Sequence, residues 1–493
     1  MVEPLSIVAT VDLCLKWGAV LAKKCSAFAH AGDEVAEGML RIRNCCIRTK
    51  LQLEVIRKLP LHEEYGKIQN ENLEVLVAKL KAAVDRVESV SGEEGLRRFK
   101  YAVLQPKIEQ TIVDLEAWQE EFDPSWYLLM RAVAPQIDEA LTDYEHTAPP
   151  ATRSLIASAR RLRSALHPQT TRHRPVFYKE SDTASLEVHD IPMSTARLGL
   201  QKDPPKTLIL DSRIYPASVI NNRQLEKDVR DLARKLIQAD PFEFGLLQCK
   251  GVVKHCDDGS DSFTFIFRLP PGYSEPRSLR HCLLNMERPD SLSDRFRLAS
   301  DLAKSVLFVH TFGFVHKNVR SDTILLLKNG DSALDSAFLV GFDTFRSEDG
   351  HTALRGSTDW QRSLYQHPSR IGSQVTQDYI MQHDIYSLGV CLLELGLWES
   401  FVMYRDNGAV VTCPLIGDPD PPQFKDRLLS LARGELRSRM GNLYSQVVET
   451  CLTSLDPGNA DFGDENEFQD TDGIEVGVRY IEKIMMRLSS ITV

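Results

Sequence analysis

The chain has no excess of positive charge, no paired cysteine motif and no secretory signal pattern. Its 59 Lys and Arg residues are outnumbered by 69 Asp and Glu residues, and a net charge of −10 argues against general nucleic-acid binding. Its ten cysteines include no Cys-x-x-Cys pair, and the adjacent Cys45 and Cys46 could not form an ordinary disulfide. We therefore expect reduced, mostly buried thiols in a cytoplasmic protein.

A calcium-loop pattern is also missing. The acidic run Asp461–Asp472 lacks the glycine and the ligand spacing of an EF-hand, so we expect a surface loop and no metal site there. What is present is ordinary for a globular protein: 43% of the residues are hydrophobic and 26% are charged. A length of 493 residues is enough for two or three domains, each with its own core.

The segment Leu5–Ala22 is strongly apolar but carries Asp12 and Lys16. Eighteen residues of helix are marginal for crossing a bilayer. Each charge at the bilayer centre would cost roughly 2.5–3.5 kcal/mol. We therefore expect this segment to be a buried helix of a bundle.

Residues 1–145 carry successive stripes of apolar residues at helical spacing. The expected helices after the first are Asp33–Leu59, Asn72–Val90, Leu96–Glu121 and Ser125–Val133. Asp123 and Pro124 fit the N-cap and first-turn positions of the last of these. Short turns between such helices predict a helical bundle.

Residues 146–176 form a segment of distinct charge, with six arginines and no Asp or Glu. Within it, Leu155–Leu166 is a candidate for a short basic helix. We interpret the segment as a solvated connector. Two alternatives are a brace between domains and a patch for anionic lipid.

Residues 177–272 have the pattern of a small β-rich lobe. Phe263, Phe265 and Phe267 alternate as on a half-buried strand, preceded by the turn signal Asp258-Gly259. Thr207–Ile214 is a second strand candidate, and Asn222–Ile237 is an amphipathic helix.

The stretch Phe314–Leu326 reads FVHKNVRSDTILL and resembles a protein-kinase catalytic loop, whose pattern is H-R-D-L-K-x-x-N. His316 keeps the first position of that pattern. Asn318 stands at the position of the catalytic Asp, Arg320 at that of the Lys, and Thr323 at that of the metal-binding Asn.

Three further pieces follow the kinase order and spacing. A helical pattern over Ser291–Phe314 precedes the loop. The run LVGFD after it places Gly341 where kinases have the metal-binding Asp. Asp384 then opens DIYSLGVCLLELGLW, which resembles the buried kinase helix that anchors the catalytic loop. The resemblance implies a bilobal α+β protein-kinase-like fold with its small lobe at 177–272 and its large lobe at 273–493, after an all-α bundle.

The resemblance also implies which parts of phosphoryl transfer are altered. No G-x-G-x-x-G loop precedes Arg213, the candidate for the ATP-binding Lys position. An amide such as that of Asn318 cannot accept a proton near pH 7. We therefore predict a pseudokinase, not an enzyme, with no intact catalytic residue and no metal ligand. Binding of ATP, through Arg213 or Asp343, remains conceivable but lacks support in the sequence.

Some residues could rescue catalysis. Asp343, two residues after Gly341, is a candidate metal ligand, and Asp322 is a candidate base. Solvated loop carboxylates are the more ordinary interpretation of both. His316 is expected to be a packed structural histidine.

Residues 1–145 resemble the HeLo-type domains of filamentous fungi in PLSIVATVDLCLK, RIRNCCIRTKLQLEVI and FDPSWYLLMR. The layout of bundle and kinase-like domain is similar to that of mixed-lineage kinase domain-like proteins. The resemblance implies incompatibility or cell-death signalling, in which the kinase-like domain controls a first helix that acts on membranes. The residues expected to contact an anionic membrane or a partner are Leu5, Ile7, Val8, Trp17, Lys23 and Lys24.

Two other functions stay open. The bundle and the kinase-like domain could dock protein partners as an adaptor without membrane contact, which Asp12 and Lys16 favour. The chain could also be an atypical ATP-dependent protein kinase. We expect protein partners, homo-oligomers through the bundle and at most a peripheral place at a membrane.

Overall fold

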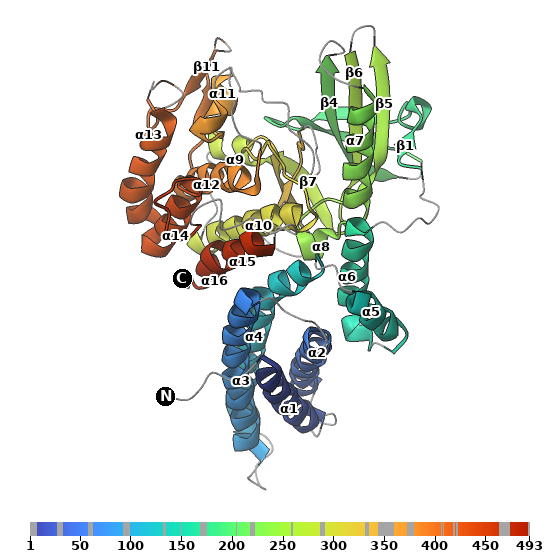
Figure 1. The fold of residues 1–493 in the computed structure, drawn as a ribbon, viewed down its shortest axis with the longest axis vertical. Coiled ribbons are helices and arrows are strands. Elements are labelled where there is room, and N and C mark those ends of the chain that lie inside the picture. The colour runs from blue at the N-terminus through green and yellow to red at the C-terminus, as the bar shows by residue number, and fades with distance from the viewer. Residues whose placement is uncertain are drawn as a thin grey trace. The chain divides into compact units, whose positions relative to one another are not determined.

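The structure, a computed structural model, divides the chain into two compact units, Met1–Arg163 and Ser164–Val493 (Figure 1). It describes residues 7–26, 33–57, 63–91, 99–131, 135–147, 149–167, 175–203, 205–216, 222–257, 260–285, 291–330, 335–343, 359–371, 379–405, 407, 409–417, 420, 423–462 and 474–491. Leu5, the turn Asp258-Gly259 and most of the acidic run Asp461–Asp472 lie outside these residues.

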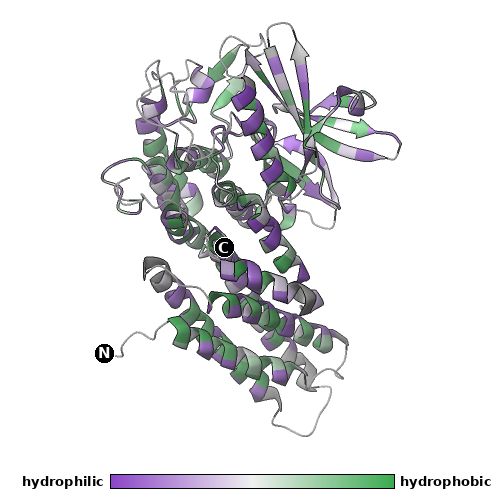
Figure 2. Cartoon of the chain, turned by 45° about the vertical axis from the view of Figure 1, so that its right-hand side comes forward, coloured by the Kyte–Doolittle hydropathy of each residue, from purple (hydrophilic) through white to green (hydrophobic). Residues whose placement is uncertain are grey.

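Unit 1 is all-helical. Its helices are α1 (Ile7–Ser26), α2 (Asp33–Ile56), α3 (Glu63–Ser91), α4 (Phe99–Leu129), α5 (Pro135–Thr147) and α6 (Arg153–Leu166), with a 3₁₀ turn at Pro150–Thr152. Helices α1 and α4 each pack against both α2 and α3. Figure 2 shows hydrophobic and hydrophilic residues interleaved along these helices, as the 3.6-residue period requires for helices with one buried face.

The helix expected to begin after Pro124 is not separate. Helix α4 continues from Phe99 to Leu129 with Pro106 and Pro124 inside it. Proline removes a helical hydrogen bond but does not prevent the helix from continuing when packing holds the chain. Phe122, Trp126 and Tyr127 on both sides of Pro124 are at most 1% exposed, so their burial outweighs the local signal.

Helix α6 includes the expected basic helix Leu155–Leu166 and begins two residues earlier, at Arg153. Arg163 is buried, donates from Nε to Asp138 Oδ1 over 3.0 Å, and donates from Nη1 to the Met130 carbonyl over 3.0 Å. This arginine is therefore part of the structure of unit 1 and not a solvated charge.

Unit 2 begins with a six-stranded sheet in the order β1-β5-β6-β4-β3-β2. The strands are β1 (Phe177–Tyr178), β2 (Glu187–Asp190), β3 (Ala196–Gln201), β4 (Lys206–Pro216), β5 (Cys249–Asp257) and β6 (Ser260–Arg268). All neighbours are antiparallel except β1 and β5. The alternating Phe263, Phe265 and Phe267 are all buried in β6. Helix α7 (Asn222–Ile237) packs against β5, and α8 (Pro241–Phe244) follows it.

A larger lobe follows, with a three-stranded sheet of β7 (Tyr273–Ser278), β8 (Ile324–Asn329) and β9 (Asp335–Leu339). Its helices are α9 (Leu279–Leu284), α10 (Leu292–Thr311), α11 (Trp360–Ser363), α12 (Met381–Leu397), α13 (Phe424–Leu431), α14 (Arg437–Leu452), α15 (Ile474–Tyr480) and α16 (Met486–Ser489), and the hairpin of β10 (Val402–Tyr404) and β11 (Val410–Thr412) completes it. Ser291 caps α10 by accepting a hydrogen bond from the amide of Asp294.

Every residue of α12 is buried, which makes this helix the centre of the large lobe. Glycines allow it to approach α14 closely. A Cβ atom added to Gly389 would lie 2.7 Å from Cys451 Cβ, and one added to Gly396 would lie 2.8 Å from Tyr444 Cε1. Helix α12 therefore offers a rigid base for the loops that contact it.

The predicted fold class is confirmed: a helical N-terminal unit precedes a mixed sheet and helices with the arrangement of a kinase-like domain. Among the described helices, none combines the length and the hydrophobicity needed to cross a bilayer.

Candidate functional site

The loop between α10 and β8 carries the residues that resemble a catalytic loop, and Asp384 of α12 binds the backbone of this loop. Asp384 is fully buried and accepts hydrogen bonds from the backbone amides of His316 (2.6 Å) and Lys317 (2.9 Å). Its carboxylate also contacts His310 Nε2 at 3.2 Å and accepts from the Tyr379 hydroxyl at 2.8 Å. Burial opposes ionisation, but the bonds and charge of His310 and the amide of His316 outweigh it and lower the pKa of Asp384.

His316 is fully buried and packs against Phe342, with ring centroids 4.5 Å apart. The amide of Asn318 points at its Nδ1 atom over 3.3 Å. Burial lowers the pKa of His316 to about 4, so the ring is neutral near pH 7. A neutral, enclosed imidazole can orient the loop backbone but has no open path to a substrate.

Asn318 lies where a kinase has its catalytic Asp, and its side chain serves the backbone. Its Nδ2 atom donates to the Gly341 carbonyl over 2.8 Å. Thr323 Oγ1 donates to the Asn318 carbonyl over 2.7 Å and accepts from the amide of Arg320. The three residues that replace the catalytic and metal-binding positions are thus joined to one another.

Gly341, at the position of the metal-binding Asp, has no space for a side chain. Its φ angle is +83°, a conformation that favours glycine. A Cβ atom there would lie 2.5 Å from a Thr323 carbon and 2.7 Å from Arg213 Nη2. The described residues near Gly341 therefore leave no space for the Asp side chain that binds magnesium at this position in kinases.

The neighbour of Gly341 that the sequence reasoning missed is Asp211. Asp211 and Arg213 are two residues apart in β4 and so lie on one face of the strand. The fully buried Asp211 accepts from the Gly341 amide over 2.9 Å and pairs with Arg213 at 3.2 Å. Burial raises the pKa of Asp211. The strand alternation could have suggested this pair, because Arg213 was already a candidate.

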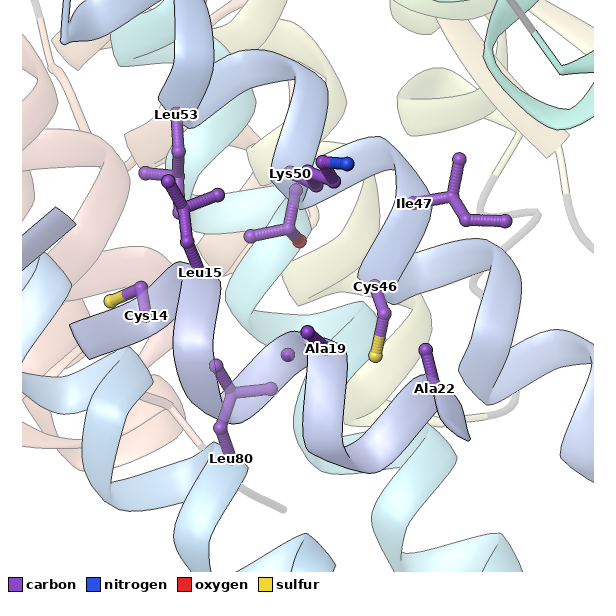
Figure 3. A pocket seen from close by; sticks show the side chains of 11 residues that line it. Cys14, Leu15, Ala19, Ala22, Cys46, Ile47, Lys50, Leu53 and Leu80 are labelled. Atoms are coloured by element: carbon purple, nitrogen blue, oxygen red, sulfur yellow. The ribbon is translucent and has the colours of Figure 1, made fainter. Parts of the chain in front are cut away.

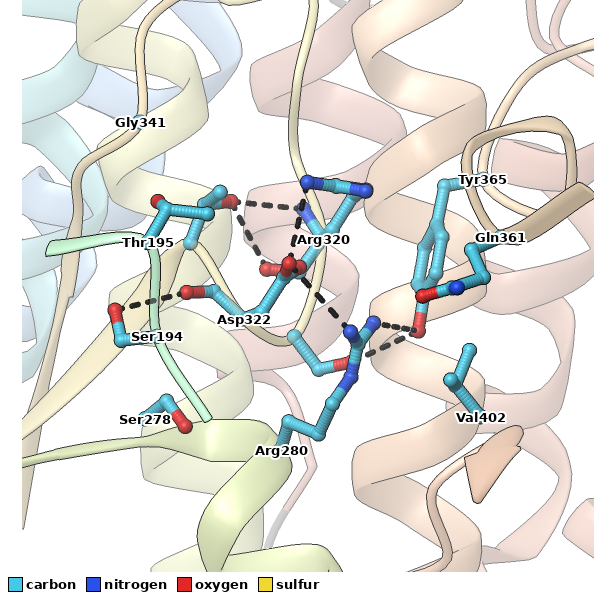
Figure 4. A network of polar contacts seen from close by, with 12 residues as sticks. Ser194, Thr195, Ser278, Arg280, Arg320, Asp322, Gly341, Gln361, Tyr365 and Val402 are labelled. Atoms are coloured by element: carbon cyan, nitrogen blue, oxygen red, sulfur yellow. Dashed lines mark hydrogen bonds and ion pairs between the residues drawn. The ribbon is translucent and has the colours of Figure 1, made fainter. Parts of the chain in front are cut away.

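Asp322 lies in a buried polar network (Figure 4). Its Oδ2 atom lies 3.1 Å from Arg320 Nη2 and 3.5 Å from Arg280 Nη1. Arg280 also donates to the hydroxyl of Tyr365, which in turn donates to Glu394 at 2.9 Å. Burial acts against the charge on Arg280, but Tyr365, Asp322 and Glu394 raise its pKa.

The second candidate carboxylate, Asp343, is also engaged. It forms an ion pair with Arg362, which lies in α11. Both candidate carboxylates are therefore neutralised by arginine, and neither is a free loop charge. Within the part of the chain that the structure describes, no group of three or more His, Cys, Asp or Glu side chains could hold a metal ion.

The candidate membrane residues of unit 1 are spread around α1. Val8 is 46% exposed, whereas Ile7 is half-buried. Trp17 lies under Lys81, whose Nζ atom is 5.7 Å from the ring centroid. Lys24 pairs with Glu88 at 2.6 Å, and Lys23 is exposed. These side chains do not converge on one surface patch.

An apolar pocket of about 60 Å³ lies beside α1 (Figure 3). Cys14, Leu15, Gly18, Ala19 and Ala22 of α1 line it together with Cys46, Ile47, Thr49, Lys50 and Leu53 of α2 and Leu80 of α3. The small side chains of α1 at this place leave the space that larger ones would fill.

Comparison with known proteins finds similarity to protein kinases. The chain is 25% identical over 181 residues to the CTD kinase subunit alpha of Schizosaccharomyces pombe, which covers 36% of this chain and 29% of that protein. It is 26% identical over 119 residues to a probable serine/threonine-protein kinase of Dictyostelium discoideum, which covers 23% of this chain and 6% of that protein. No protein-family model matches the chain.

These relatives, with the fold, identify a kinase-like domain, and the matched segments span less than a third of each relative. They also overturn the prediction that the chain is not an enzyme, because both relatives are named as kinases. That prediction rested on a comparison at the usual catalytic positions. Such a comparison does not test whether other carboxylates take a catalytic role, such as Asp322 in the loop and Asp343 after Gly341.

Proposed function

We propose that the chain is a kinase-like signalling protein in which unit 2 controls the helical bundle of unit 1. In this proposal α1 is the element that acts on an anionic membrane, as the resemblance of residues 1–145 to HeLo-type domains implies. The biological setting would be fungal incompatibility or regulated cell death. The kinase-like unit supplies the switch, and a ligand or partner that prefers one of its conformations supplies the trigger.

The observation that supports this proposal is the loose packing of α1. The pocket of about 60 Å³ removes some contacts between α1 and its neighbours α2 and α3, so less packing energy opposes the release of α1. The polar contacts of α1 include a hydrogen bond of 2.7 Å from the buried Thr10 hydroxyl to Asn70 Oδ1 and an exposed ion pair of Asp12 with Arg57 at 3.4 Å. Exposed ion pairs of this kind contribute at most about 1 kcal/mol each.

The test is dye release from vesicles that contain phosphatidylserine. We expect residues 1–167 to release the dye and the full chain to release little. In the full chain, the double change Arg57→Ala and Glu88→Ala should raise release, because it removes the ion pairs of Asp12 with Arg57 and of Lys24 with Glu88 and leaves both charges of α1 in place.

The matched control is Arg41→Ala, which removes a bidentate pair with Glu116 between α2 and α4 and leaves α1 untouched. Equal release by the double variant and this control would contradict a role of α1. Absence of release from every protein would point instead to an adaptor that binds protein partners.

A second candidate function is phosphotransfer by an atypical protein kinase, which the two kinase relatives favour. Asp322 lies in the loop that resembles a catalytic loop, and Asp343 follows Gly341 by two residues. If they take part, Asp322→Asn or Asp343→Asn should reduce ATP turnover at least tenfold. Turnover that is unchanged in both variants would exclude this role for them.

A further inference from the structure

The loop between β2 and β3, residues Ile191–Thr195, reaches from the small lobe to the large lobe of unit 2. We call it the strap. Ser194 Oγ donates a hydrogen bond of 3.0 Å to the carbonyl of Asp322. Ser278 Oγ donates a hydrogen bond of 2.8 Å to the carbonyl of Pro192. Two separate bonds therefore fix one loop of the small lobe to two elements of the large lobe.

Both anchor points on the large lobe are rigid. Ser278 is fully buried and also caps α9, since its hydroxyl accepts from the amide of His281 over 3.1 Å. Asp322 is held by Arg280 and Arg320. The strap is therefore tied to fixed groups of the large lobe.

The strap itself stores backbone strain. Met193 at its tip has a φ angle of +54°, in the left-handed region that side chains other than glycine seldom adopt. Met193 is also 42% exposed, so burial of its side chain does not compensate for this conformation. The amide of Ser194 also donates to the Ile191 carbonyl over 3.1 Å and closes this turn, while the bonds of Ser194 and Pro192 to the large lobe hold the turn in place.

The position of the strap suggests that it blocks access of a nucleotide. It joins two adjacent antiparallel strands and lies beside the loop that carries Asp322, as Figure 4 shows for Ser194. In kinases a loop between two such strands covers the phosphates of the nucleotide. Here Thr195 contacts Arg213 at 3.5 Å, so the strap is closed down onto the side chain at the candidate ATP-binding position.

We propose that the strap is an autoinhibitory latch: it holds the two lobes closed over residues 316–323, and a nucleoside triphosphate must displace it to reach them. The proposal rests on the kinase-like fold and not on any action of unit 1 at a membrane. With the strap bound, the side chain of Asp322 is only 11% exposed and that of Arg320 only 13%. Its release would expose this pair.

The experiment is hydrogen–deuterium exchange on the full chain, with Ser194→Ala as the opening variant. This change removes the bond of Ser194 Oγ to the Asp322 carbonyl and the bond it accepts from the Ala196 amide at 3.2 Å, and the loss of each bond shifts an opening equilibrium roughly two- to tenfold. We expect exchange to become faster by such a factor in both the strap and residues 316–323. The matched control is Ser212→Ala, which removes a hydroxyl contact of 2.9 Å with Thr264 inside the small-lobe sheet. Exchange in residues 316–323 that is the same in both variants would overturn the proposal.

A second measurement uses titration with a fluorescent ATP analogue. If the strap competes with nucleotide, the ATP analogue should bind the Ser194→Ala protein more tightly than the unaltered chain. The ratio of the two affinities should equal the factor found in the exchange experiment. Equal affinities, or no binding to either protein, would overturn the occlusion. Both readouts lie within unit 2, so a failure of unit 1 to release dye from vesicles leaves them unaffected.

Discussion

At the scale of the residue, the most informative group is Asp384, because one carboxylate receives four hydrogen-bond partners from three elements. The change Asp384→Asn keeps the size of the side chain but replaces an accepting oxygen with an NH₂ group that faces donors. We expect a loss of about 3 kcal/mol in the free energy of unfolding of unit 2. Denaturation in urea measures it.

The control for this change is Asp426→Asn on the exposed side of α13. It should alter the free energy of unfolding by less than about 0.5 kcal/mol. A loss for Asp384→Asn as small as that of the control would mean that the loop does not depend on its anchor.

The histidines of unit 2 give a pH dependence of defined sign. His316 has a pKa of about 4 in the folded chain and about 6.5 when unfolded, so between these values the unfolded state binds more protons. The contribution of His316 to stability is thus complete above pH 6.5 and is lost as the pH falls toward 4. The slope is about 1.4 kcal/mol per pH unit for each such group.

The measurement is the free energy of unfolding between pH 4 and 7.5. His316→Gln should lower the slope of the free energy of unfolding against pH by the contribution of one proton. Burial also lowers the pKa values of His367 and His383, to about 4 and about 3. Both histidines therefore reduce the free energy of unfolding as the pH falls, and they do so equally in the unaltered chain and in the variant. A slope that His316→Gln leaves intact would contradict a buried neutral ring.

At the scale of the element, the crossing of α12 and α14 predicts opposite effects of the same substitution at two glycines. Alanine is favoured over glycine in a helix by about 1 kcal/mol. At Gly434, where an added Cβ meets nothing within 4 Å, Gly434→Ala should stabilise unit 2 by about 0.5–1 kcal/mol. At Gly389, the contact with Cys451 Cβ at 2.7 Å should make Gly389→Ala destabilising by about 1–3 kcal/mol.

Thermal unfolding of the two variants measures this difference. If Gly389→Ala raised the midpoint of thermal unfolding as Gly434→Ala does, α12 and α14 would be able to move apart at little cost in free energy. The comparison needs no assumption about activity, because both glycines lie in helical segments of the same lobe.

The elements also show what the sequence could predict. Patterns with many apolar residues, such as Asn222–Ile237 and the alternating phenylalanines of β6, predicted elements that the structure contains. The false break at Pro124 has a physical cause: local signals describe one turn, whereas Trp126 and Tyr127 are fixed by contacts with distant helices. In the site, the loop residues were predictable from their motif and Asp211 could have been suggested as a neighbour of Arg213, but its bond with the Gly341 amide could not, since it joins residues 130 positions apart.

At the scale of the whole molecule, two compact units predict two unfolding transitions. Arg163→Ala removes the buried guanidinium that binds Asp138 and the Met130 carbonyl. We expect it to lower the midpoint of one transition, that of unit 1, by several degrees and to leave the other unchanged. Differential scanning calorimetry distinguishes the two.

Arg153→Ala, at an exposed position of the same helix, is the control and should shift neither midpoint by more than about one degree. A single transition that moves as a whole in Arg163→Ala would show that the units unfold together. The result therefore decides whether each unit can be studied by itself.

The position of Arg163 has a consequence for proteolysis in the cell. A cut between α5 and α6 would separate this arginine from Asp138 and leave a buried acceptor of unit 1 without its donor. A cut after Leu166 would release the same helices with that contact intact. The two cleavage sites lie only some twenty residues apart. The cut between α5 and α6 would give a fragment prone to degradation, whereas the cut after Leu166 would give one that persists.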